Sequence, residues 1–101
     1  MLNEMDKLRN MLDVNRVKYN YNVRPGGIKQ IIVYDNGIEV VDIIYGSGIR
    51  GFRQGLLAII GLLTEEELER DDVVGYLTAE NVYDRIKKYF NSVETKGEKQ
   101  C

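Results

Sequence analysis

The sequence predicts an α+β domain in which helices pack against an antiparallel β-sheet. Three observations lead to this expectation. Three strand-like segments follow one another across two turn signals, amphipathic helical patterns stand on both sides of them, and hydrophobic residues make up 44% of the 101-residue chain. We therefore expect one domain over residues 1–93, followed by a disordered tail over residues 94–101.

An amphipathic helix is expected over residues 2–14. Its apolar residues recur at spacings of three and four, with charged residues between them, so that they form one stripe along the helix. The residues of this stripe are Leu2, Met5, Leu8 and Leu12. Such a stripe favours packing of the helix against a sheet.

Residues 17–23, 28–34 and 38–45 are expected to form a three-stranded antiparallel meander. The first segment alternates strictly between polar and apolar residues, and the other two are rich in β-branched residues. Pro25-Gly26 fits a turn between the first two strands. Asn36-Gly37 is the typical sequence of a type I′ hairpin turn between the second and the third.

Two-residue loops at both turns would fix which side chains share a face of the sheet. They would pair Val23 with Ile28, Tyr34 with Glu39 and Ile32 with Val41. The face opposite Val41 would then carry a second apolar patch, made of Ile31, Val33, Ile38, Val40 and Ile44. A monomer rarely leaves such a patch exposed. Either a helix covers it, or it forms a homodimer or partner interface with Ile31, Val33 and Val40 as candidate contacts.

Two or three helices are expected after the strands. The apolar run over residues 52–63 falls on one helical stripe and fills most of the remaining helix surface, which is typical of a buried helix. Thr64 and Glu67 have the spacing of a capping box and predict a short acidic helix. Thr78 is expected to be the N-cap of a final amphipathic helix that ends near residue 93.

Composition argues against several classes of function. The formal net charge is −2, which gives no basic field to attract nucleic acid, so direct nucleic-acid binding is not expected. Histidine is absent and the only cysteine is the terminal Cys101, so we expect no catalytic centre, no metal site and no cofactor. The longest apolar run covers residues 55–63 and is far shorter than the roughly 20 residues that span a bilayer. We therefore expect a non-enzymatic protein of the cytoplasm.

A glycine-rich loop over residues 46–53 raises the question of anion binding. Its glycines have the spacing G-x-G-x-x-G, but a dinucleotide fingerprint requires a parallel β-α-β unit, and here the preceding strand belongs to an antiparallel meander. A weaker hypothesis is that a helix begins near Gly51 and holds a phosphate or carboxylate with its free N–H groups. The alternative is a purely structural connection from strand to helix. The candidate anion contacts are Gly48, Arg50, Gly51 and Arg53.

Six carboxylates gather within the eight residues 65–72. This acidic cluster is either a solvated surface segment, or it mimics phosphate charge and docks on a basic, nucleic-acid-binding surface of another protein. Its members are Glu65, Glu66, Glu67, Glu69, Asp71 and Asp72.

The segment from Gly55 to Phe90 contains "GLLAIIGLLTEEE" and "GYLTAE". It resembles the C-terminal half of small proteins carried by phages and prophages of Gram-positive bacteria. In these proteins a glycine-containing loop precedes the "GLL" repeats, and a final helix follows "GYLTAE". The loop "GSGIRGF" is longer and more basic than that pattern, so no residue role is carried over.

The resemblance implies a context rather than a chemistry, because small phage-encoded proteins often act by binding and some are anti-CRISPR or other anti-defence inhibitors. We therefore expect a protein-binding accessory protein that inhibits a host defence system inside the bacterial cell. Its partner would be a host protein, such as a nucleic-acid-binding defence protein. The alternative is a small-ligand protein that binds a nucleotide or another anion at the glycine loop.

Overall fold

The computed structural model describes residues 3–99, with the side chains of residues 3–92. The elements in chain order are α1 (Glu4–Val14), β1 (Tyr19–Arg24), β2 (Ile28–Asp35), β3 (Ile38–Tyr45), the 3₁₀ turn η1 (Phe52–Gln54), β4 (Leu57–Ile60), α2 (Glu65–Arg70), β5 (Val74–Leu77) and α3 (Ala79–Lys99). The strands form one antiparallel sheet in the order β1-β2-β3-β4-β5. The α+β class is confirmed, but the sheet has five strands rather than the expected three.

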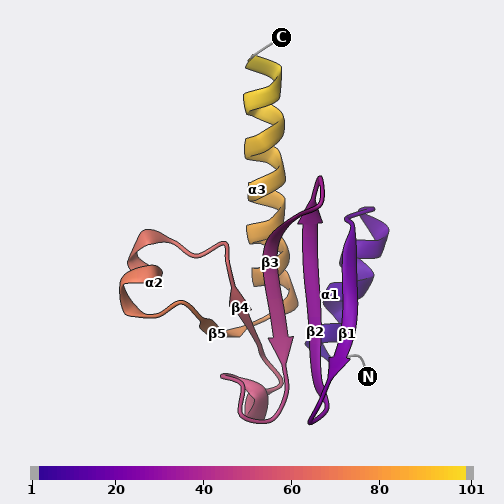
Figure 1. The fold of residues 1–101 in the computed structure, drawn as a ribbon, viewed down its shortest axis with the longest axis vertical. Coiled ribbons are helices and arrows are strands. Elements are labelled where there is room, and N and C mark those ends of the chain that lie inside the picture. The colour runs from indigo at the N-terminus through magenta and orange to yellow at the C-terminus, as the bar shows by residue number, and fades with distance from the viewer. Residues whose placement is uncertain (1–2, 100–101) are drawn as a thin grey trace.

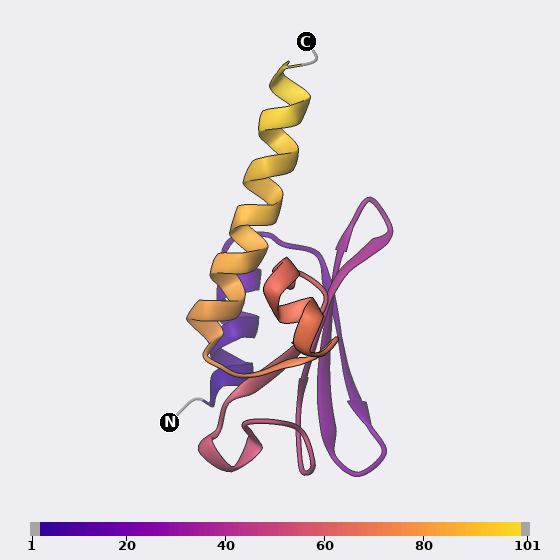
Figure 2. The same ribbon diagram turned by 90° about the vertical axis from the view of Figure 1, so that its left-hand side faces the viewer.

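The helices α1 and α3 lie on the same face of the sheet, and no helix of the described chain covers the other face (Figures 1 and 2). α2 stands apart at the β4–β5 side, and α3 extends well beyond the sheet (Figure 1). The core lies between the sheet and the two packed helices. Its buried residues are Met5, Leu8, Leu12, Ile31, Val33, Val41, Ile43, Leu57, Ile59, Ala79, Val82 and Ile86.

The turn between β1 and β2 has three residues, not the expected two. Arg24 pairs with Ile28, and the loop Pro25–Gly27 places two consecutive glycines at φ values of 85° and 77°. The expected pairing of Val23 with Ile28 is therefore wrong, because Val23 pairs with Lys29. A second glycine after Pro25-Gly26 lets the longer loop form without steric cost, since glycine adopts positive φ freely.

The turn between β2 and β3 is confirmed at Asn36-Gly37, where both residues have positive φ (51° and 81°), as a type I′ turn requires. The expected pairing of Tyr34 with Glu39 is also confirmed. The register then shifts, so that Val33 pairs with Val41. Val40 is the additional residue of a β-bulge, which changes the phase of side-chain alternation along β3.

The bulge puts Ile31 and Val33 on the same face as Val41, under α1 and α3, and the three-residue turn puts Tyr19 and Tyr21 on that face as well. The expectation that Ile31 and Val33 form a separate apolar patch is wrong, because both side chains are 0% exposed in the core. Val40 is half-buried and packs against the same core. The expected pairing of Ile32 with Val41 is also wrong, since Ile32 pairs with Asp42.

The helix expected over residues 52–63 is wrong. One 3₁₀ turn is followed by the strand β4, whose first three residues are fully buried. Gly55 and Gly61 bound this short run in left-handed conformations, with φ values of 73° and 101°. A run of four apolar residues has no polar face, so periodicity alone does not distinguish a core strand from a buried helix.

The capping signals are confirmed. Thr64 caps α2 in a reciprocal capping box with Glu67. The Oγ1 atom of Thr78 accepts a hydrogen bond from the N–H of Asn81, whose Oδ1 accepts from the N–H of Thr78 (both 3.1 Å). β5, which precedes Thr78, was not expected. α3 runs to Lys99 and residues 100–101 lie outside the described chain, so the disordered tail over 94–101 stays a prediction.

Two hydrogen bonds join α3 to distant parts of the fold. The Oε1 atom of Glu4 accepts from the N–H of Ala79 (2.9 Å), which lowers the pKa of Glu4 and ties the start of α1 to the start of α3. The hydroxyl of Tyr89 donates to Oδ2 of Asp35 (2.9 Å) at the end of β2. α3 is therefore fixed to the start of α1 and to the end of β2.

Exchange of Ile31 for Ala should lower the free energy of unfolding by about 2–5 kcal/mol, because it opens a cavity in the core. The matched variant is Ile32→Ala on the uncovered face, where the side chain is only half-buried. It should cost about 1 kcal/mol. Urea denaturation of both variants measures the difference, and equal losses would contradict the observed register.

Candidate functional site: an acidic arm between β4 and β5

The residues between β4 and β5 leave the sheet and form a separate arm (Figures 1 and 2). We call residues 61–73 the acidic arm; it contains α2 and the whole acidic cluster. None of the six residues of α2 is buried. Leu62 and Leu63 pack the start of the arm against the core, whereas α2 itself is held by polar contacts.

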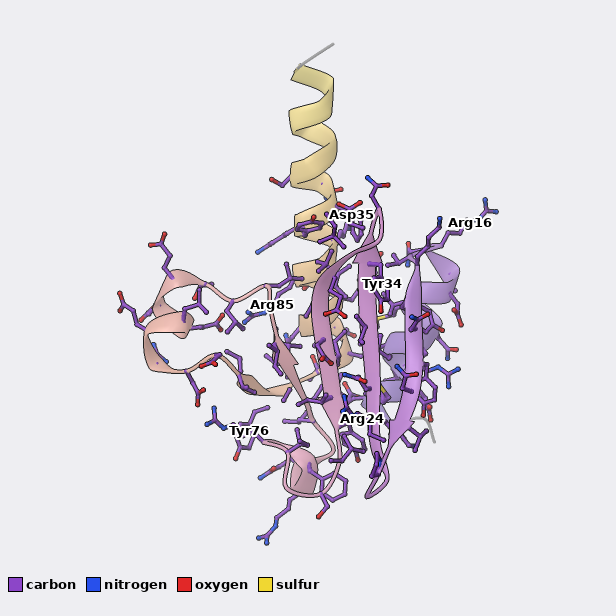
Figure 3. All side chains as sticks on the ribbon, viewed as in Figure 1. Arg16, Arg24, Tyr34, Asp35, Tyr76 and Arg85 are labelled. Atoms are coloured by element: carbon purple, nitrogen blue, oxygen red, sulfur yellow. The ribbon has the colours of Figure 1, made fainter. Side chains whose placement is uncertain are left out.

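The first anchor of the arm is an ion pair between Arg85 of α3 and Glu67 of α2. Arg85 donates from Nη1 to Oε1 and from Nη2 to Oε2 of Glu67, both at 2.7 Å, and from Nη1 to the carbonyl oxygen of Leu62 at 3.0 Å. Figure 3 shows the Arg85 side chain extending from α3 toward the arm. Two parallel bonds of this kind combine charge with fixed geometry.

Glu67 is also part of the capping box of α2. Its Oε1 accepts from the N–H of Thr64 at 2.9 Å. The hydrogen bonds from Arg85, and then that from Thr64, lower the pKa of Glu67 from 4.5 to about 2. One carboxylate thus caps the N-terminus of α2 and also ties the helix to α3.

The second anchor lies at the far end of the arm. Arg50, in the loop after β3, donates from Nη2 to Oδ2 of Asp71 and from Nη1 to the carbonyl oxygen of Val73 at 3.1 Å. The hydrogen bond from Arg50 lowers the pKa of Asp71. Gly75 allows this approach, because a Cβ atom there would lie 2.3 Å from Cβ of Arg50. A larger residue at position 75 would push β5 away from the loop that contains Arg50.

The structure divides the acidic cluster into internal and outward members. Glu67 and Asp71 serve as anchors, and Glu66 pairs with Arg70 at 2.9 Å on the exposed surface. The other three carboxylates are partly or fully exposed and form no ion pair within the described residues. They are Glu65, Glu69 and Asp72.

One large apolar side chain stands among these outward carboxylates. Leu68 is 57% exposed. It follows Glu65 by three positions and precedes Glu69, so the three side chains share one side of α2. Asp72 follows α2 after one extended residue and is also exposed. We call Glu65, Leu68, Glu69 and Asp72 the outer face of the arm.

The apolar contacts expected on the sheet are not available on the surface. Ile31 and Val33 are in the core, and Val40 packs against it at the bulge. The uncovered sheet face is polar at its centre, where Nε2 of Gln30 donates to both carboxylate oxygens of Asp42 at 2.9 Å. Homodimer formation stays a prediction.

The four candidate anion contacts at the glycine loop, Gly48, Arg50, Gly51 and Arg53, all line one open cleft. Arg50 also pairs with Asp71, so its charge is partly used within the fold. The helix expected to begin near Gly51 is the single turn η1, so the N-terminus of a long helix is not part of this loop. Gly48 and Gly51 both have positive φ, 87° and 88°.

Sequence reasoning missed Arg85 and Leu68 as parts of the site. Arg85 lies 18 positions from Glu67, and only the fold brings them together. Leu68 carried a local signal, because it is the single apolar residue in "EEELER". Single exposed apolar residues are common on protein surfaces, so Leu68 is a candidate contact only together with the carboxylates around it.

A comparison of the chain with protein-family models, curated proteins and solved structures finds no match. Within residues 3–99, no helix combines the length and apolarity needed to span a bilayer. In the same part of the chain, no three Asp, Glu or Cys side chains gather as metal ligands would. The function of the candidate site is therefore inferred from its geometry.

The ion pair between Arg85 and Glu67 makes a pH-dependent contribution to stability. The folded pKa of Glu67 is below its usual value of 4.5, so the stabilisation is complete above pH 4.5 and is lost as the pH falls toward 2. Glu67→Gln should lower the free energy of unfolding at pH 7 by roughly 1–3 kcal/mol, because the pair is only about a fifth exposed (23% and 21%). Urea titrations between pH 2 and pH 7 measure this.

Glu66→Gln is the matched control. Its pair with Arg70 is exposed on both sides (72% and 77%) and should contribute less than about 0.5 kcal/mol. If both variants lose the same small amount, Arg85 and Glu67 do not anchor the arm.

Proposed function

We propose that the protein is a non-catalytic binding protein whose acidic arm docks on a basic surface of a partner protein. The observation that carries the proposal is Leu68, an exposed apolar side chain between Glu65 and Glu69 on an arm that has no core of its own. Protein interfaces commonly combine a buried apolar contact with a polar rim. Leu68 would supply the apolar contact, and the carboxylates would supply the polar rim.

The anchoring of the arm supports this role. Arg85 fixes α2 at Glu67, and Arg50 fixes the chain after α2 at Asp71. An arm that is already ordered loses less conformational entropy on binding than a mobile loop. The two ion pairs therefore favour a preformed contact surface.

The charge of the outer face indicates the kind of partner. Its three carboxylates, with Glu66 close by, give a negative surface on a protein whose overall charge is only −2. A spaced row of carboxylates can occupy positions that phosphate groups of a nucleic acid would take on a basic protein surface. A nucleic-acid-binding protein is therefore the partner class we propose.

The resemblance of residues 55–90 to small phage proteins adds a biological context, because that segment contains the whole arm. We accordingly propose a host defence protein as the partner and inhibition of that protein as the outcome, in the manner of an anti-CRISPR protein. A protein that blocks a nucleic-acid site by charge mimicry needs no catalytic residue and no cofactor.

A charge-neutral outer face should abolish partner binding. The variant carries Glu65→Gln, Glu69→Gln and Asp72→Asn, and the tagged protein is used to capture partners from lysate of a Gram-positive host with a CRISPR system. We expect the unmodified chain to retain one dominant basic protein, and the variant to bind that purified protein at least about tenfold more weakly. Binding should also weaken as salt is raised, because the contact is electrostatic.

The matched control neutralises three exposed carboxylates away from the arm, with Glu39→Gln, Glu80→Gln and Asp84→Asn. It has the same net charge as the first variant and should keep its affinity. Leu68→Ala should weaken binding without changing the charge. A partner that is bound equally by both triple variants would rule out the acidic arm as the contact surface.

A further inference from the structure

The glycine loop and β5 together form an open cleft of about 590 Å³ on a different part of the surface from the outer face of the arm. This volume is within the range of small-molecule sites, roughly 300–1,000 Å³. Its lining includes Ser47, Gly48, Phe52, Arg53, Gln54 and Tyr76. It therefore offers backbone amides, a cation and aromatic rings in one place.

Tyr76 forms the β5 side of the cleft in an unusual conformation. Its φ is 60°, in the left-handed region that aromatic residues rarely adopt, and its side chain is 58% exposed. Figure 3 shows Tyr76 beside the turn η1. The core gains little from a ring in that position, and glycine would adopt the same backbone without strain.

The loop is fitted closely to Tyr76. A Cβ atom on Gly51 would lie 2.9 Å from the backbone nitrogen of Tyr76, so only glycine allows this contact. The Phe52 ring, 38% exposed, rests against Tyr45 with ring centroids 5.2 Å apart. Two partly exposed aromatic side chains thus line a cleft whose backbone is held by close packing.

Arg50 and Arg53 both line the cleft, and Arg53 supplies its unpaired positive charge. Its side chain is exposed and has no ion pair within the described residues, whereas Arg50 is held by Asp71 and Val73. The N–H of Gly48 likewise donates no hydrogen bond in the part of the chain that the structure describes. These two donors are available to an anion.

We propose that the cleft binds a small aromatic phosphate of the nucleoside monophosphate class. The base stacks on Tyr76, as bases stack on exposed aromatic side chains in single-strand binding proteins. The phosphate meets Arg53 and the amide of Gly48. This site does not depend on the acidic arm as a docking surface.

AMP is the probe, and adenosine and ribose 5-phosphate are its two halves. Each is titrated into the ¹⁵N-labelled protein while amide chemical shifts are followed. AMP should move the amide signals of Gly48, Gly51 and Tyr76 and saturate, and each half should bind at least about tenfold more weakly. Equal binding of adenosine would overturn the role of Arg53, and equal binding of ribose 5-phosphate would overturn the role of Tyr76.

Tyr76→Gly removes the ring but should leave the fold intact, because glycine adopts the left-handed backbone without strain. This variant should unfold at the same or a higher temperature and bind AMP about tenfold more weakly, whereas Tyr76→Phe should bind it normally. Arg53→Ala should weaken binding by a similar factor, and Lys18→Ala, an exposed cation at the opposite end of the sheet, should not. Unchanged AMP binding by Tyr76→Gly, or shifts confined to residues outside the loop, would refute the proposal.

Discussion

The phase of side-chain alternation along β2 and β3 is the constraint on which the rest of the structure depends. A slip of one residue exchanges the two faces of a strand. The bulge at Val40 sets this phase, so that Ile31 and Val33 face the helices together with Val41 and Ile43, while the three-residue turn before β2 sets the phase between β1 and β2. α1 and α3 then have an apolar surface to cover, and β3 presents its other edge to β4.

The acidic arm follows from this arrangement, and only its first residues, Leu62 and Leu63, pack against the core. β4 and β5 pair through only a few residues, and the chain between them leaves the sheet with no buried residue in α2. Hydrophobic burial therefore positions the start of the arm but not α2. The position of α2 rests on Glu67 with Arg85 and on Asp71 with Arg50, two contacts in which charge and geometry act together. The same contacts decide which carboxylates remain outside.

Local chemistry explains which parts of the fold could be predicted. The N-caps at Thr64 and Thr78 and the Asn36-Gly37 turn depend on neighbours within three residues, and all three are present. The strand Leu57–Ile60 and the bulge at Val40 depend on contacts with other strands, which no local pattern records. For the site, the sequence shows that the cluster is acidic. It does not show which acids are internal, because that depends on arginines 18 and 21 positions away.

Arg50 separates the two surfaces for which functions are proposed. Its guanidinium donates to Asp71 and to the carbonyl of Val73, so its charge is largely neutralised by a carboxylate of the same chain. The glycine loop therefore depends on Arg53 for its positive charge, and the arm depends on Glu65, Glu69 and Asp72 for its negative charge. The exposed pair of Arg50 with Asp71 connects the glycine loop to the arm. A protein with a net charge of −2 can in this way present an acidic docking face and a basic ligand cleft on neighbouring segments.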